Sequence, residues 1–263
     1  MKKPNKKAML FNITLVFVTI IVLTAAFAIL VRKNSQFDTG IGKRQTQLIK
    51  TYQEADKLLL YIDHSARLTT ETTLYNLAQK GGYKNKPSCG SSSDYTFWRK
   101  KDQECYPEKI SLNFKKLFDI SFDQYIFLYN RNNELKFPTN NYEYTIYQDN
   151  IIGTAFENIE LEIPSSGISK YSFKPSFNIP LNFDLNIYTK TIEQAKQLVN
   201  CNLNNNPEQC RTDLLTTDEY KDWTTNKQSN TYFFDIKTGK TIWIYTDLLK
   251  QEEIIIKFAI DFS

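Results

Sequence analysis

Histidine is almost absent from this 263-residue sequence, in which His64 is the only one. The sequence therefore excludes H-E-x-x-H and two-histidine metal sites, and a Ser-His-Asp system would have to use that single residue. It also lacks G-x-S-x-G, S-x-x-K, G-x-x-x-x-G-K-[ST] and G-x-G-x-x-G motifs. These absences argue against the common hydrolases and nucleotide-binding proteins. We predict no catalytic residue, no metal site and no cofactor, and hence no enzyme.

A large excess of charge of one sign is also missing. The 33 lysines and arginines are interspersed with 29 acidic residues, which leaves a formal net charge of +4. Without a basic face, no nucleic-acid partner is expected. The acidic residues of the C-terminal half, among them Glu143, Glu157, Glu160 and Glu162, offer the paired carboxylates of a glycosidase, but at this frequency they are ordinary surface residues.

A long apolar run is the clearest positive feature. Residues 9–31 contain no charged residue, glycine or proline, and as a helix they span roughly 35 Å, enough to cross a bilayer. The lysines before this run and Ala26-Phe27-Ala28 within it also suit a cleaved signal peptide. We favour a retained anchor, because the run exceeds the usual length of a signal-peptide core.

The four cysteines fall as two sequence-local pairs, Cys89 with Cys105 and Cys201 with Cys210. None belongs to a C-x-x-C motif, and zinc ligands are normally spaced more closely. We predict two local disulfides, because closing a short loop costs the least entropy. Disulfides require an oxidising compartment, which places the C-terminal part outside the cytoplasm. Buried free thiols in a cytosolic domain are the alternative.

A long helix is predicted over residues 43–79, which contain no glycine or proline and are followed by Gly81 and Gly82. A glycine-containing joint, residues 39–42, is expected to separate it from the anchor. Its apolar residues follow a heptad spacing that forms a candidate interaction seam: Leu48, Tyr52, Ala55, Leu59, Ile62 and Ala66. The seam packs either against a second copy or against the chain's own domain. We favour the second, because Thr69 and Thr73 weaken the seam.

The predicted fold class is α+β, with this long stalk helix packed on a mainly antiparallel sheet. Helices are expected at 108–130 and 191–200, where Thr191 and Gln194 fit a capping box. Alternating apolar residues predict strands at 142–147, 151–156, 159–163, 171–177, 181–188 and 254–262. Gly239 suggests a hairpin turn between strands 232–236 and 241–245. The expected organisation is a cytoplasmic tail (1–8), a transmembrane helix (9–31), a linker and stalk helix (32–82) and an extracytoplasmic domain (83–263).

Two tryptophans differ in sequence context. Trp243 lies in an apolar strand segment and is expected in the core. Trp98 precedes Arg99-Lys100-Lys101 in the cysteine-closed loop, so it is the candidate surface aromatic for a sugar or a protein partner.

The layout resembles type IV pilin-like proteins, which have a basic leader, an apolar N-terminal helix that continues as a soluble helix, and a disulfide-bearing β-rich head. The resemblance covers about the first 80 residues and implies peptidase cleavage in Lys6-Lys7-Ala8, before Met9. The sequence departs from the pilin pattern at Ala8, where glycine is usual, and at Ile13, where glutamate is usual.

The chain is also similar to uncharacterised membrane-anchored proteins of small-genome archaea. This similarity lies in the segments TYQEA (51–55), YNLAQKGGY (75–83), NNYEY (140–144) and KPSF (174–177), and it implies no specific function. The sequence predicts a non-enzymatic structural or assembly protein of the envelope that contacts the membrane and either copies of itself or other envelope proteins. A surface domain that binds a glycan or a protein is the alternative.

Overall fold

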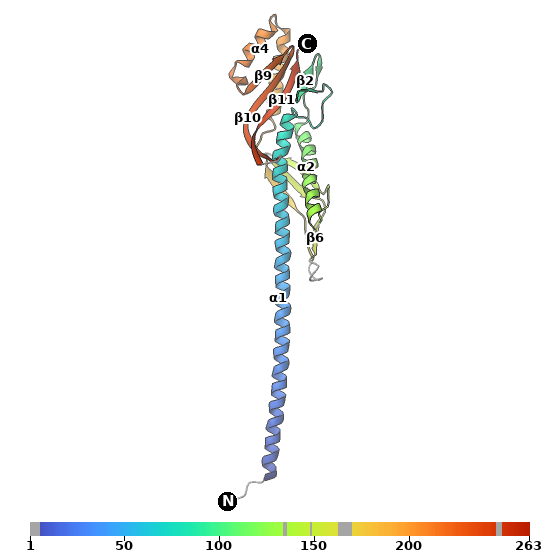
Figure 1. Ribbon diagram of the computed structural model, residues 1–263, viewed down its shortest axis with the longest axis vertical. Coiled ribbons are helices and arrows are strands. Elements are labelled where there is room, and N and C mark those ends of the chain that lie inside the picture. The colour runs from blue at the N-terminus through green and yellow to red at the C-terminus, as the bar shows by residue number, and fades with distance from the viewer. Residues whose placement is uncertain (1–5, 134–135, 148, 163–169, 246–248) are drawn as a thin grey trace. The chain divides into compact units, whose positions relative to one another are not determined.

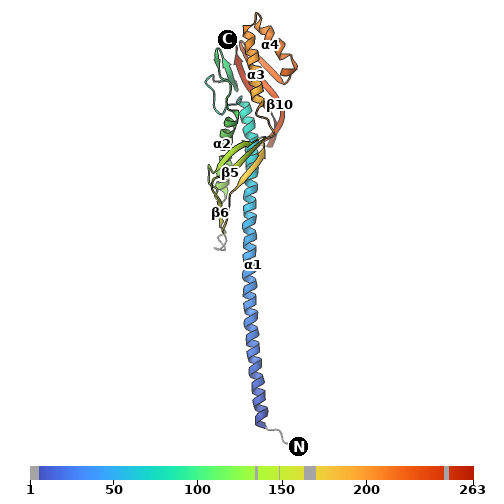
Figure 2. The same cartoon turned by 180° about the vertical axis from the view of Figure 1, so that it is seen from behind.

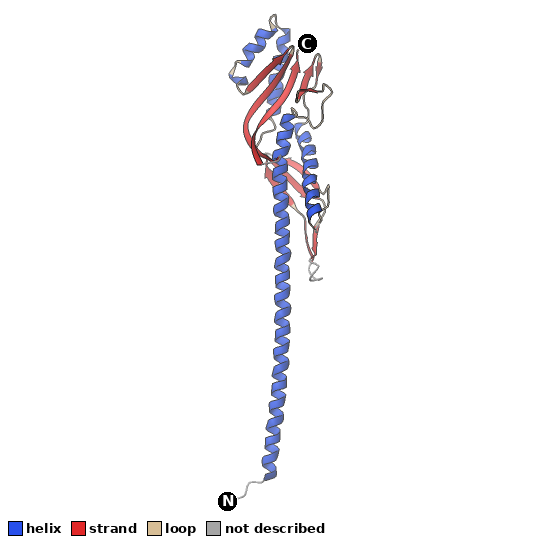
Figure 3. Cartoon of the chain, in the orientation of Figure 1, coloured by secondary structure: helices blue, strands red, loops and turns tan. Residues whose placement is uncertain are grey.

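The computed structural model describes residues 6–133, 136–147, 149–162, 170–245 and 249–263. It is a mixed α+β structure (Figure 3) with two disulfides, as predicted. Among the described residues, one compact unit comprises those within 57–160 and 172–263, and the other comprises those up to 56 and those within 161–171. The α-helices are α1 (Lys6–Gln79), α2 (Ile110–Asn132), α3 (Ile187–Asn200) and α4 (Pro207–Leu215).

Helix α1 contains the predicted anchor. Its segment Val16–Lys33 is long and apolar enough to cross a membrane, a requirement that a signal sequence near the N-terminus also meets. The large apolar side chains from Val16 to Val31 are 52–70% exposed, and Thr24 bonds to carbonyl oxygens of the preceding turn. The predicted joint at residues 39–42 is wrong, since α1 runs through it. Glycine lowers helix stability by only about 1 kcal/mol, so the flanking helix formers prevail.

The C-terminal end of α1 is fixed by its two glycines, as predicted. The amide of Gly81 donates to Ala78 O and the amide of Gly82 to Leu77 O, which is the Schellman arrangement. Gly81 has φ +59°, and a Cβ there would lie 2.8 Å from Lys257 O. Only glycine therefore fits both the conformation and the space.

The larger sheet joins segments far apart in sequence, in the order β1-β2-β11-β10-β9, with β3 paired to β2. Figure 1 shows β10 and β11 as its two long central strands. All described pairs are antiparallel except β2 with β11, which is parallel. The strands are β1 (Ser91–Ser92), β2 (Tyr95–Lys100), β3 (Gln103–Glu104), β9 (Trp223–Gln228), β10 (Thr231–Tyr245) and β11 (Leu249–Asp261).

The predicted hairpin around Gly239 is wrong. Residues 231–245 form the single strand β10, which pairs with β11 on both sides of a register shift between Lys237 and Thr241. Gly239 has φ +66°, a conformation that serves a β-bulge as well as a turn. Strand β10 is followed by β11, its antiparallel neighbour, and residues 246–248 between them lie outside the described residues.

A second sheet packs its aromatic face on α2. Its order is β4-β5-β8, formed by β4 (Tyr142–Tyr147), β5 (Asn150–Ala155) and β8 (Ser176–Pro180). The ring of Phe118 lies 5.0 Å from that of Tyr144, and the ring of Phe122 lies 5.3 Å from that of Phe177. Gly153 makes room for this cluster, since a Cβ there would lie 2.2 Å from the Phe177 ring.

Two short strands, β6 (Ile159–Glu162) and β7 (Lys170–Phe173), form a separate ribbon. The predicted strand at 181–188 is wrong, because α3 already begins at Ile187. Thr191, expected to cap that helix, is buried inside it and donates to Ile187 O. The disulfide Cys201–Cys210 then joins the end of α3 to α4, which lie beside each other in Figure 2.

The last part of α1 contributes to the core of the larger unit. Its buried residues recur at helical spacing: Leu58, Ile62, Ala66, Leu74, Leu77 and Ala78. Tyr61 donates a 2.7 Å hydrogen bond to Tyr125 O of α2, and Glu71 accepts one from the Trp243 amide of β10. Packing of the whole 43–79 helix on the sheet remains a prediction.

Candidate functional site

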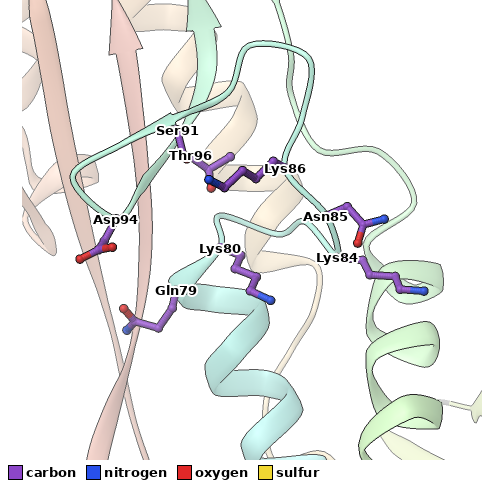
Figure 4. Close-up of a pocket in the computed structure, with 8 residues that line it drawn as sticks. All are labelled: Gln79, Lys80, Lys84, Asn85, Lys86, Ser91, Asp94 and Thr96. Carbon is purple, nitrogen blue, oxygen red and sulfur yellow. The ribbon is translucent and has the colours of Figure 1, made fainter.

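A lysine-rich pocket next to the end of α1 is the candidate site (Figure 4). It has a volume of about 430 Å³. Its lining comes from the last residues of α1, the following loop and the β1–β2 turn: Gln79, Lys80, Lys84, Asn85, Lys86, Ser91, Asp94 and Thr96. Sequence analysis did not predict this pocket, because its lining combines residues before Cys89 with residues inside the loop that the disulfide Cys89–Cys105 closes.

The frame of the pocket is held in place by buried contacts. The disulfide Cys89–Cys105 joins the loop to the strand region behind it, and both sulfurs belong to an apolar cluster with Phe97, Phe233 and Ala259. On the other side, the indole of Trp98 donates a 2.9 Å hydrogen bond to Gly81 O. The disulfide and this hydrogen bond therefore attach both parts of the pocket lining to the buried core.

The charge of the pocket is predominantly positive. Lys80 and Lys86 are exposed and Lys84 is partly buried, and within the described residues none of the three has an ion pair. Asp94 is the only acidic side chain in the lining. In Figure 4, the side chain of Lys86 extends toward Thr96, Lys80 extends from the end of α1, and Lys84 points away from Lys86 and Thr96. The remaining lining side chains are amides and hydroxyls, so the site favours binding through charge and hydrogen bonds.

The predicted surface role of Trp98 is wrong. Its side chain is fully buried, and its ring stacks on Phe258 with the centroids 3.8 Å apart. Arg99 lies on the opposite face of β2 because side chains alternate along a strand, and Lys100 is exposed at the end of the strand. Trp243, expected in the core, is 48% exposed.

The structure separates the six residues of the predicted seam into two groups. Ala55, Ile62 and Ala66 are buried and Leu59 is partly buried, whereas Leu48 and Tyr52 are 50% and 47% exposed. The ring of Tyr52 lies 5.1 Å from that of Tyr171. The C-terminal part of the seam is thus internal packing, and only its first turns remain accessible to a partner.

A group of carboxylates and tyrosines lies on α2 and β4. Burial raises the pKa of Asp123, and it raises the pKa of Tyr144, with Asp119 and Asp123 adding to the effect. The part of the chain that the structure describes contains no group of three or more His, Cys, Asp or Glu side chains that could hold a metal ion. Glu143, Glu157 and Glu160 are exposed, and the side chain of Glu162 lies outside the described residues.

Comparison with known proteins found no match to this chain among protein-family models, curated proteins or solved structures.

Proposed function

We propose that this protein is anchored in the membrane by a single helix, that its disulfide-bonded domain lies outside the cytoplasm, and that it serves as a non-enzymatic structural or assembly component of the envelope. The supporting observation is the exposed apolar surface of α1 from Val16 to Val31. A contiguous apolar surface of this size is not stable in water, and lipid covers it if the segment is retained.

The two disulfides support the placement of the domain outside the cytoplasm, because reducing compartments keep thiols free. A role in assembly, in the manner of type IV pilin-like proteins, is supported by the apolar side chains that α1 leaves accessible beyond the anchor. Leu48 and Ile49 are 50% and 57% exposed. A second copy of α1 would cover them. Binding of a ligand is the second candidate function, supported by the lysine-rich pocket.

The topology is tested on intact cells. Protease added from outside should degrade the domain after residue 33 and leave the anchor, because the domain is expected on the outer side. Immunoblotting with an antibody against the C-terminal strand measures this, and a cytoplasmic protein in the same cells serves as the control for lysis. Full protection of the domain in intact cells, followed by digestion after lysis, would place it in the cytoplasm and contradict the proposal.

The assembly role is tested by Leu48→Lys combined with Ile49→Lys. If copies of α1 meet along this surface, the double change should abolish oligomers in cross-linked native membranes, because it buries two unpaired charges. The matched control is Lys50→Gln combined with Gln53→Lys, which alters exposed positions of the same helix without removing apolar surface. Assembly through α1 would be rejected if the natural protein and the Leu48→Lys, Ile49→Lys variant formed the same amount of cross-linked oligomer. It would also be rejected if both were monomers.

A further inference from the structure

We propose that the lysine-rich pocket at the end of α1 binds a saccharide that carries carboxylate or sulfate groups. This inference goes beyond the structural role and relies on the proposed function only for the outward placement that gives access to such a ligand. Binding is measured on the purified protein, so it can fail while the membrane topology and assembly are as proposed, and the reverse also holds.

The first argument is that the positive charge of the pocket exceeds the negative charge of its own lining. Lys80, Lys84 and Lys86 bring three positive charges to one concave surface that contains a single carboxylate, Asp94. Lys80, directly after the last residue of α1, also interacts with the partial negative charge of the helix end, which amounts to about half an elementary charge. That partial charge offsets a fraction of the lysine charge and leaves a net attraction for anions.

The second argument is the distribution of these charges. The three lysines occupy separate positions in the lining: Lys80 follows the last residue of α1, and Lys84 and Lys86 lie in the loop after it, with Lys86 directed toward Thr96 (Figure 4). Separate ammonium groups favour an extended ligand that carries more than one anionic group. The volume of about 430 Å³ lies within the common range of small-molecule sites, about 300–1,000 Å³.

The third argument is the chemistry of the walls. Gln79, Asn85 and Ser91 present amide and hydroxyl groups, and the lining contains no aromatic side chain. A nucleotide base would lack a ring to stack on, and a lipid chain would meet no aliphatic or aromatic residue in the lining. Hydroxyl-rich ligands pair with amides and hydroxyls, and carboxylate or sulfate groups pair with lysine. A charged saccharide satisfies both requirements.

The test is calorimetric titration of the full chain in non-ionic detergent micelles. The probes are tri-galacturonic acid, a sulfated disaccharide, neutral maltotriose and inorganic phosphate. We expect at least one charged saccharide to bind more tightly than maltotriose and phosphate, with an affinity that falls as salt is raised.

Two sets of variants distinguish the pocket from general surface charge. Lys80→Gln, Lys84→Gln and Lys86→Gln together should weaken binding about tenfold, the sum of three partly screened charge interactions. The matched control is Lys116→Gln, Lys221→Gln and Lys237→Gln, which removes the same charge from exposed positions outside the pocket and should preserve binding. Asp94→Asn should tighten binding, since it removes the one repulsive group.

The proposal is overturned by any of three results. These are no binding of either charged saccharide at millimolar concentration, equal binding of maltotriose or phosphate, or equal loss of affinity in the pocket variant and the control variant. Unchanged thermal unfolding of all variants ensures that a loss of binding reflects the pocket and not the fold.

Discussion

Replacing Trp98 with alanine should lower the free energy of unfolding of the disulfide-bonded domain by about 3–5 kcal/mol, the usual cost of truncating a buried aromatic residue. The indole is fully buried and stacks on Phe258, whose ring also meets the edge of Trp223. The truncation would leave a cavity next to β11 and would remove the hydrogen bond to Gly81 O. Loss of that bond would also release the end of α1 that borders the pocket.

Denaturant titration of the full chain in micelles, followed by circular dichroism, measures this change. Trp243→Ala is the matched control, because Trp243 is 48% exposed, and it should cost less than about 1 kcal/mol. If the two variants were equally stable, the placement of Trp98 in the core would be refuted. A charged-saccharide titration of Trp98→Phe then tests whether the stacked ring also maintains the shape of the pocket.

The second large effect is expected in alkali. Burial raises the pKa values of Tyr142, Tyr144 and Tyr188 well above the ordinary value of 10.0. Above pH 10 the unfolded chain releases these protons while the folded chain retains them, so the folded state becomes less stable as the pH rises. Each such tyrosine should lower the free energy of unfolding by about 1.4 kcal/mol per pH unit. Below pH 10 the three tyrosines are protonated in both states and cause no such pH dependence.

Unfolding by urea at a series of pH values between about 9 and 12 measures this slope. Tyr144→Phe should make the slope shallower by about 1.4 kcal/mol per pH unit, and Tyr147→Phe, at a 62% exposed position of the same strand, should leave it unchanged. All four cysteines are in disulfides, so no free thiol is present to start disulfide exchange during short exposures. Identical slopes for the natural protein and Tyr144→Phe would contradict the burial of this hydroxyl.

Local features of the sequence predicted the parts of the fold that depend on neighbouring residues. The apolar run of α1 follows from composition alone. The helix end follows from Gly81, because a left-handed residue after a helix strongly favours glycine. The two disulfides follow from the short separations, 16 and 9 residues, because closing a short loop costs little entropy.

Features that need a distant partner could not be predicted in this way. Gly239 supplies a positive φ both in a turn and in a bulge, and only the pairing of β10 with β11 on both sides of it selects the bulge. In the same way, the parallel pairing of β2 with β11 joins residues that are more than 150 positions apart. No local propensity distinguishes parallel from antiparallel partners for so short a strand.

The same division applies to the candidate site. The sequence by itself determined the apolar segment near the N-terminus, the α+β composition, the helix end and the cysteine pairs, because each depends on residues close together along the chain. The tertiary structure decided that Trp98 is buried and that Lys80, Lys84 and Lys86 line a pocket with Ser91 and Thr96. The physical reason is that burial and concavity are set by which surfaces pack together, and β11, from the far end of the chain, supplies the surface that covers Trp98.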